Sequence, residues 1–250
     1  MKICYALGME KKKFKILLIN LGYCTGINGF FWQYIAKMHR YIYLPKAIEK
    51  KILQKMKAVV TEEDPDIICL IEIKKGRQVR TLMSEDYLFH DIKTKYGEKS
   101  LLKKMPFFYN KGNAFIAKED FSFQAHYLQH GAKRLVYEII LPNKISLLLV
   151  HFSLTKRVRK KQFQSIAQLP LQNKQFIVCG DFNVFGGLQE LDQLVENSFL
   201  KIINPAPTFP AFKPSKSLDL FLCSQNITAD ARVLDEQISD HLPVMLEIFI

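Results

Sequence analysis

Short apolar runs recur along the chain, separated by polar segments, and this pattern predicts buried strands. Pro65 and Asp66 interrupt the pattern before one such run, which closes on the acidic residue Glu72. A tight turn at 142–144 separates two neighbouring runs, as expected for a hairpin. The predicted strands are 14–20, 67–71, 114–117, 135–141, 145–152, 176–179, 218–223 and 242–249.

Three segments are predicted to form helices. Segment 45–60 places its apolar residues on one face at helical spacing, with lysines opposite. Thr155 is a suitable N-cap for a second helix that extends to about residue 169, and a third helix is expected over 188–195. Because strands and helices do not alternate strictly, we expect two packed sheets with helices outside rather than a doubly wound parallel sheet.

Length and composition favour a single domain. The chain has 250 residues, 48% of them hydrophobic and 24% charged, without repeats or a flexible linker. No apolar run approaches the roughly 20 residues that are needed to span a bilayer. The five cysteines are scattered, and Cys69, Cys179 and Cys223 lie inside apolar runs, so we expect a reducing, cytoplasmic location rather than a disulfide framework.

The chain carries a net charge of +12, with lysine and arginine clustered at 37–57, 74–80 and 156–161. This charge is compatible with solvated helix faces on a soluble protein. It is equally compatible with attraction to a polyanion or to anionic lipid, and charge alone does not separate these interpretations.

Polar side chains recur at or just beyond the ends of the predicted strands. A carboxylate that closes an apolar run costs free energy unless it is paired or binds a metal ion. Carboxylates, amides and imidazoles at the ends of strands are the groups that metal-assisted hydrolysis of phosphate esters requires. The residues concerned are Asn20, Glu72, His151, Asp181, Asn183, Asp219, Asp240 and His241.

This constellation resembles the endonuclease/exonuclease/phosphatase superfamily, which has the DNase-I-like fold. The two strings Gly-Asp-Phe-Asn at 180–183 and Ser-Asp-His at 239–241 carry most of the resemblance, and the order of the other motifs agrees. One departure is Ile71, which stands where the family usually has glutamine. The resemblance implies an α+β, four-layer α/β/β/α sandwich of two mostly antiparallel sheets over residues 14–250, preceded by a flexible segment at 1–13.

The resemblance also implies a metal site. Asn20 and Glu72 would hold a divalent cation, with Asp240 nearby. Mg²⁺ is the expected ion because it prefers a few hard oxygen ligands and keeps several of its waters. Mn²⁺ is the alternative.

The remaining motif residues receive catalytic roles by the same resemblance. Asp181 would orient or deprotonate the attacking water, and Asn183 would position it. His241, oriented by Asp219, and His151 would donate to the phosphoryl oxygens, where charge grows in the transition state.

Three further residues are candidates for contact with the substrate phosphate. They are Arg134, Asn113 and Tyr109. For Arg134, a solvated surface charge is an equal alternative.

The substrate itself stays open at this point. The first hypothesis is a nuclease, which the basic charge favours. The second is a hydrolase of phospholipid head groups or of phosphate monoesters, because the aromatic residues of segment 29–44 could lie at an anionic membrane surface as well as stack on bases. Burial of these aromatics in the core, or a binding module that has lost its activity, are further alternatives.

Overall fold

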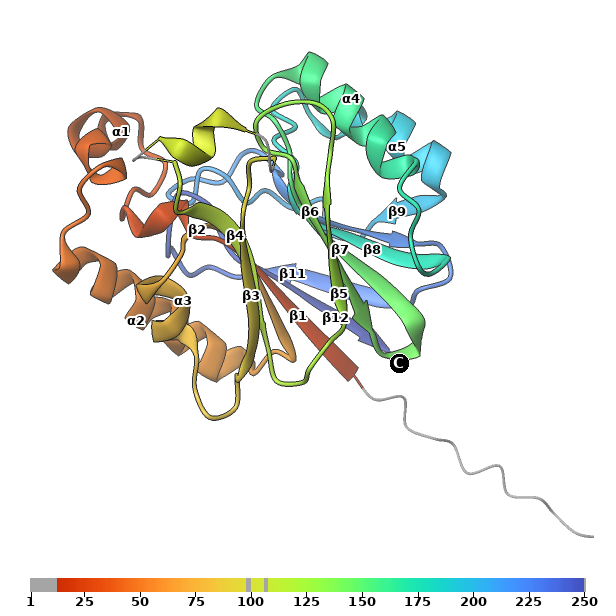
Figure 1. Cartoon of the computed structure of the whole chain (residues 1–250), viewed down its shortest axis with the longest axis horizontal. Coiled ribbons are helices and arrows are strands. Elements are labelled where there is room, and N and C mark those ends of the chain that lie inside the picture. The colour runs from red at the N-terminus through yellow and green to blue at the C-terminus, as the bar shows by residue number, and fades with distance from the viewer. Residues whose placement is uncertain (1–12, 98–99, 106–107, 250) are drawn as a thin grey trace, which may run out of the picture.

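Two six-stranded sheets form the centre of the molecule (Figure 1). The computed structural model describes residues 13–97, 100–105 and 108–249. The predicted flexible segment 1–13 lies outside these residues except for Lys13, which begins the first strand.

The first sheet contains one parallel pair, β1 with β2, and its other neighbours are antiparallel. Its strands, in spatial order, are β11 (Ala229–Val233), β12 (Val244–Phe249), β1 (Lys13–Asn20), β2 (Ile67–Lys74), β4 (Lys111–Ala117) and β3 (Phe89–Thr94).

The second sheet repeats this arrangement, with β7 and β8 as its parallel pair. Its strands are β5 (Phe123–Tyr127), β6 (Leu135–Leu141), β7 (Ile145–His151), β8 (Gln175–Asp181), β10 (Asp219–Ser224) and β9 (Leu200–Ile202). The prediction of two mostly antiparallel sheets is therefore confirmed.

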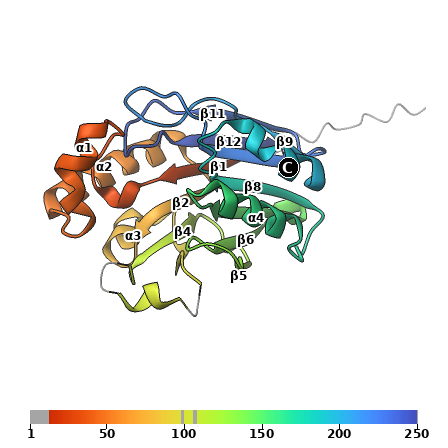
Figure 2. The same cartoon turned by 90° about the horizontal axis from the view of Figure 1, so that it is seen from above.

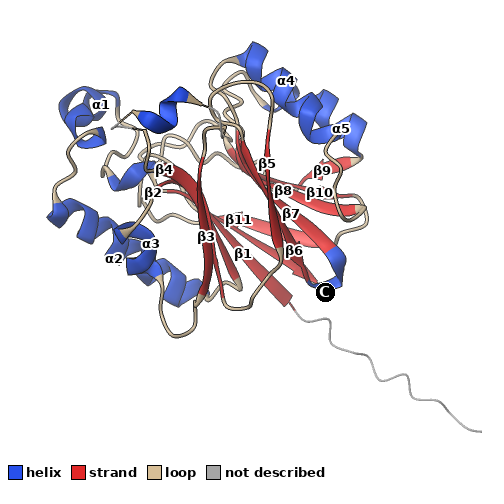
Figure 3. Cartoon of the chain, in the orientation of Figure 1, coloured by secondary structure: helices blue, strands red, loops and turns tan. Residues whose placement is uncertain are grey.

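Helices form the two outer layers (Figures 2 and 3). Apolar residues of α2 (Lys46–Glu63) and α3 (Arg77–Leu82) pack on the first sheet. Those of α4 (Lys156–Ala167) and α5 (Asp192–Ser198) pack on the second. The predicted four-layer sandwich is confirmed. No helix in the described part of the chain is long and apolar enough to cross a membrane.

Strand β1 shows why the central strands are apolar without interruption. Ile16 and Leu18 face the core between the two sheets, whereas Leu17 and Ile19 face α2. Side chains of a strand alternate between its faces, so a strand covered on both sides needs apolar residues at nearly every position.

The largest differences from prediction lie at the margins of the fold. Strands β3, β5, β9 and β11, which the sequence pattern did not reveal, are short and only partly buried. The expected helix over 188–195 is a 3₁₀ turn at Leu188–Leu191 followed by α5. Thr155 does precede α4, but its side chain makes no capping bond.

Helix α1 (Phe31–Lys37) was also missed, because it has no buried residue and therefore no apolar stripe toward the core. It continues into a 3₁₀ turn, η2 (Met38–Tyr41). In both views these turns lie at one end of the molecule, outside the two sheets (Figures 1 and 2).

The core between the sheets allows a direct test. Leu149 is fully buried there, so Leu149→Ala should lower the free energy of unfolding by about 2–5 kcal/mol through lost burial and a residual cavity. Leu88→Ala, at an exposed leucine, should change it by less than about 0.5 kcal/mol. Chemical denaturation measures both, and equal effects would contradict the assignment of the core.

Candidate active site

All eight predicted motif residues meet at one end of the sandwich. Strands β1 and β2 run parallel and end there, as do β7 and β8, while the antiparallel strands β12 and β10 begin there. A cleft of about 320 Å³ opens at this end, and His151 and Asp219 lie directly behind its wall. The motif residues that line it are Asn20, Glu72, Asp181, Asn183, Asp240 and His241.

Asp181 is central because three adjacent strands align on it. His151 of β7 and Asp219 of β10 are its register partners on either side. His151 Nε2 lies 3.3 Å from Asp181 Oδ2. Gly180 precedes Asp181 with a φ of 150°, and a Cβ there would lie 1.9 Å from the Val150 carbonyl oxygen. Only glycine therefore allows β7 and β8 to approach so closely.

His241 and Asp219 form a buried pair. His241 Nδ1 donates to Asp219 Oδ2 at 2.6 Å, and Thr208 Oγ1 donates to the same oxygen at 2.6 Å. Burial alone would lower the pKa of His241, but the Asp219 carboxylate outweighs it and raises the pKa to about 10. The imidazole therefore carries a positive charge at neutral pH, and the Phe209 ring packs on it with centroids 4.9 Å apart.

His151 has the opposite protonation. Burial and the neighbouring Lys133 cation lower its pKa to about 4, so its imidazole is neutral at pH 7. Asp181 stays ionised: burial opposes its charge, but the bond with His151 and the nearby cations of His241 and Lys133 lower its pKa well below the usual range. The site thus places a charged imidazole on Asp219 and a neutral imidazole on Asp181.

Two asparagines hold Asp181 in place. Asn20 Nδ2 donates to Asp181 Oδ2 at 3.3 Å and so joins the two sheets. The Asn183 backbone N–H donates to Asp181 Oδ1 at 3.0 Å, and its side chain donates to the Phe152 carbonyl at 3.0 Å. Asn183 has a φ of 53°, an uncommon conformation for a residue other than glycine and one that concentrates at functional sites.

Glu72 is directed into the cleft by an irregularity of β2. The register with β4 shifts between Leu70 and Ile73, and Glu72 takes a φ of 55°. Such bulges often redirect a side chain at an active site. Burial would raise the pKa of Glu72, but Lys95, with Nζ 3.2 Å from Oε1, lowers it to about 2. The carboxylate is therefore ionised.

Asp240 also lines the cleft, and among the described residues it forms no ion pair; its nearest cation is its neighbour His241. The Tyr34 hydroxyl of α1 donates to Asp240 Oδ2 at 2.6 Å. Burial raises the pKa of Asp240. A buried carboxylate in this situation is stabilised by a bound cation.

The donors in the cleft fit a divalent metal ion. Asn20, Glu72 and Asp240 supply hard oxygens at one cleft wall, and the same set suits Mg²⁺. A second set, Asp181, Asp219 and His241, has ligand atoms within 4.8 Å of one another. In that set His241 Nδ1 donates to Asp219, and a positively charged imidazole is not a metal ligand, so the first set is the better candidate. Its identity as the metal site stays a prediction.

Three lysines in the cleft were not recognised from the sequence. They are Lys95, Lys111 and Lys133. Lys133 and Lys111 lie close to the candidate residues Arg134 and Asn113 in the sequence. Lys95 follows β3, and no sequence motif near it indicates a role in the site. Lys133 Nζ contacts His151 Nε2, and burial lowers the pKa of Lys133 to about 8.

The three candidate substrate contacts lie elsewhere. The Arg134 guanidinium donates to the Leu128 carbonyl and is not part of the cleft wall. Asn113 is fully buried, and its Oδ1 lies 3.5 Å from the Glu72 backbone N–H, so it supports the bulge. Tyr109 is exposed outside the cleft.

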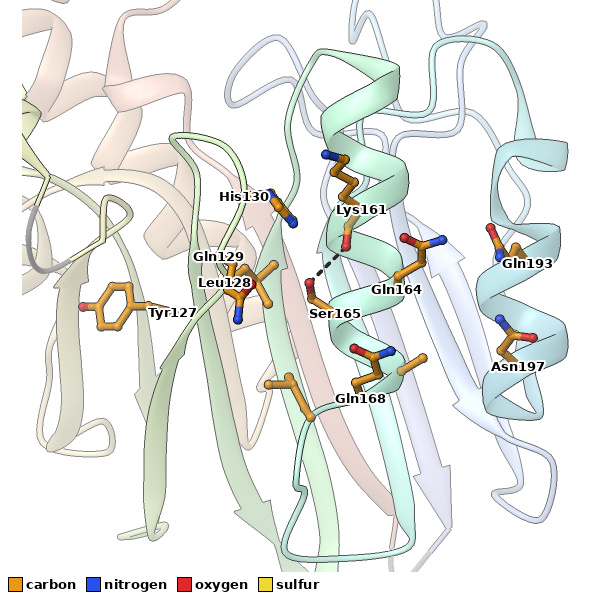
Figure 4. Close-up of a pocket in the computed structure, with 12 residues that line it drawn as sticks. Tyr127, Leu128, Gln129, His130, Lys161, Gln164, Ser165, Gln168, Gln193 and Asn197 are labelled. Carbon is orange, nitrogen blue, oxygen red and sulfur yellow. Dashed lines mark hydrogen bonds between the residues drawn. The ribbon is translucent and has the colours of Figure 1, made fainter.

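A larger pocket, of about 790 Å³, lies between α4, α5 and the end of β5 (Figure 4). Amide side chains such as Gln164, Gln168 and Gln193 dominate its wall, with His130 and Lys161 at one side. Its lining residues include no carboxylate. This pocket therefore lacks the acidic groups that metal-assisted phosphoester hydrolysis requires. Although it is larger than the cleft, it is not the candidate active site.

The fold and the site define a metal-dependent hydrolase of phosphate esters. The sequence profile of the Endonuclease/Exonuclease/phosphatase family matches residues 50–241, more than half of the chain. The protein therefore belongs to this family, as the motifs predict. A comparison with curated proteins finds no match.

Solved structures of the same fold are similar over nearly the whole chain. An endonuclease/exonuclease/phosphatase family protein from Leptotrichia buccalis C-1013-b aligns over 95% of this chain and 100% of its own, with 16% identity and a TM-score of 0.69. Sphingomyelinase C from Streptomyces griseocarneus aligns over 94% and 99%, with 14% identity and a TM-score of 0.70. A humanized D. rerio TDP2 aligns over 95% and 99%, with 15% identity and a TM-score of 0.63. At these identities the likeness shows the fold.

The charged imidazole is open to test. His241→Gln keeps a donor for Asp219 but removes the positive charge, so kcat for a chromogenic phosphodiester such as bis(p-nitrophenyl) phosphate should fall by about 10²–10³. His90→Ala, at an exposed histidine on β3, is the matched control and should leave kcat unchanged. A thermal melt checks that both variants fold. An equal kcat in the two variants would show that His241 does not take part in the reaction.

The metal set makes a separate prediction. Glu72→Gln should weaken Mg²⁺ binding about tenfold or more, measured by calorimetric titration of the EDTA-treated protein, because a charged ligand is lost. Glu85→Gln, at an exposed residue, is the control. An unchanged Mg²⁺ affinity of the Glu72→Gln variant would indicate that the ion binds to the second set of residues instead.

Proposed function

We propose that this enzyme uses Mg²⁺ to hydrolyse a phosphoester bond of an anionic phospholipid at a membrane surface. The observation that carries the proposal is the position of α1. Its Tyr34 hydroxyl bonds to Asp240 in the cleft, while Phe31 and Trp32 of the same helix are exposed. An exposed apolar surface at the mouth of a phosphate site suits a substrate that is embedded in a lipid layer.

The exposed side chains of this segment favour lipid over nucleic acid. Bases stack on aromatic faces, and aromatic residues alone would serve both ligands. Ile35, Met38 and Ile42 are exposed as well, and aliphatic side chains offer no stacking face. Their transfer from water to the acyl boundary of a bilayer is favourable.

The cleft favours a head group with negative charge. Lys95, Lys111 and Lys133 supply three cations near the metal ligands. Lysine cations already lie over two of the aromatic rings of the cleft, since Lys111 Nζ lies 4.7 Å from the Tyr23 centroid and 5.4 Å from that of Phe108. We therefore expect poor binding of choline head groups.

The residues divide the chemistry among them. Asn20, Glu72 and Asp240 would hold Mg²⁺, which supplies a positive charge for the phosphoryl oxygens.

The chain's other groups act on protons and charge. Asp181 is ionised and orients or deprotonates the attacking water, which Asn183 positions. The charged His241 donates its Nε2–H toward the phosphoryl oxygens, since its Nδ1–H is bound to Asp219. This donor is fixed before the reaction, which is the condition under which it stabilises a transition state. The neutral His151 lies behind the cleft wall, with Nε2 beside Asp181, and positions that carboxylate.

Nucleic acid is the second candidate substrate. The net charge of +12 and the three cleft lysines favour any polyanion. The solved structures of similar fold include both a sphingomyelinase and TDP2, so the likeness supports phosphoester hydrolysis without choosing the substrate.

A substrate panel tests the proposal. With Mg²⁺, release of soluble head group from phosphatidylglycerol vesicles, followed by ³¹P NMR, should exceed release from sphingomyelin vesicles. Plasmid, single-stranded DNA and RNA should stay intact on gels. EDTA and Asp181→Asn are the controls, and both should abolish turnover. Cleavage of a polynucleotide with no release from any vesicle would establish the second candidate instead.

A further inference from the structure

A second pocket, of about 370 Å³, lies between α1, η2, α2 and the loop at 237–239. It shares no lining residue with the catalytic cleft. Four cationic side chains line it, and none of its lining residues is a carboxylate. These cations are Lys37, Arg40, Lys51 and Lys55.

The bonds of these cations go to neutral oxygens. Lys37 Nζ donates to the Gly26 carbonyl at 3.1 Å and to the Gln33 side chain at 2.7 Å. Arg40 Nη1 donates to the Thr25 carbonyl at 2.9 Å, and Lys55 Nζ to the Gln237 carbonyl at 3.2 Å. Positive charge in this pocket is therefore not compensated by any ion pair seen in the described residues.

Two observations indicate that the pocket suits an anion. Arg40 Nε is buried and has no hydrogen-bond partner within the described structure. Burial, together with the charge of Arg40, lowers the pKa of Lys37. A bound phosphate would supply an acceptor to the first group and an opposite charge to the second.

The segment 30–43, which contributes Gln33, Lys37 and Arg40 to the pocket, also carries an exposed apolar surface. We call this surface the apolar rim. Its members are 45% to 73% exposed, which is unusual for side chains of this size in one short segment. The rim consists of Phe30, Phe31, Trp32, Ile35, Met38, Ile42 and Tyr43.

We propose that this pocket binds the phosphate of an anionic lipid head group while the apolar rim enters the bilayer interface. Lys37 and Arg40 lie in the same short segment as the rim, so the cations and the apolar residues meet the membrane together. This pairing of basic and apolar groups matches the interface of an anionic leaflet. The proposed lipid substrate explains why the enzyme would bind a membrane here. The binding site itself does not depend on that proposal, because it would hold a lipid that is not hydrolysed.

The position of α1 explains why such a site would serve the enzyme. The same helix holds Tyr34 on Asp240, and Tyr41 of η2 also lines the cleft. A membrane docked on the outer side of α1 and η2 therefore lies beside the catalytic cleft. Docking would raise the local concentration of lipid phosphate at the metal ligands.

Trp32 provides a direct probe, because it is the one tryptophan in the sequence and belongs to the rim. In the Asp181→Asn background, which prevents turnover, its fluorescence should shift to the blue with phosphatidylglycerol vesicles and not with phosphatidylcholine vesicles. The double variant Lys37→Glu/Arg40→Glu should weaken this binding about tenfold or more. Lys144→Glu/Lys174→Glu, at exposed lysines far from α1 in sequence, changes the net charge equally and should weaken it little.

Several outcomes would overturn the proposal. Equal loss in both double variants would mean that net charge alone drives binding. Equal binding to phosphatidylcholine vesicles would show that the pocket does not require a head group with net negative charge. A shift of Trp32 fluorescence with oligonucleotide but not with vesicles would assign the surface to nucleic acid. A melt of each variant checks folding.

The two proposals fail separately. Turnover of a soluble short-chain phosphatidylglycerol without vesicle binding would support the lipid substrate and overturn the docking site. Vesicle binding without turnover of any lipid would support the docking site and overturn the proposed substrate.

Discussion

The apolar core between the two sheets determines where every active-site side chain lies. Because neighbouring residues of a strand face opposite sides, a slip of one residue would turn the core face outward, and the pairing register is therefore strongly specified. That register aligns His151 and Asp219 on Asp181 within one sheet. Packing of the sheets then brings Asn20 to within 3.3 Å of Asp181.

The cleft concentrates charges that would be costly if they were buried alone. Lys95 outweighs the desolvation of Glu72, and His241 offsets part of that of Asp219, whereas burial still raises the pKa of Asp219 and of Asp240. The partners also set the protonation states, since one imidazole is charged and the other neutral. A site built in this way has its donors oriented before a phosphate arrives, which is the requirement for electrostatic stabilisation of the transition state.

Helix α1 links this chemistry to the outside of the molecule. One side of the helix completes the cleft through Tyr34, and its other residues form an apolar surface beside a cationic pocket. An enzyme that acts on dissolved phosphate esters has no need to expose such a surface. Because one fold can carry many specificities, we expect peripheral elements such as this one to decide the choice of substrate.

The sequence alone determined the central strands and the four-layer class, because continuous apolar runs report burial on both faces. It also indicated the candidate site residues, because these polar residues stand where the apolar runs end. It did not reveal β3, β5, β11 or α1, whose exposed positions leave no apolar periodicity. Tertiary structure decided which lysines line the cleft. It also decided that Lys133 lines the cleft and that its neighbour Arg134 does not. Local patterns report burial and periodicity, whereas distances between side chains far apart in the chain depend on how the sheets pack.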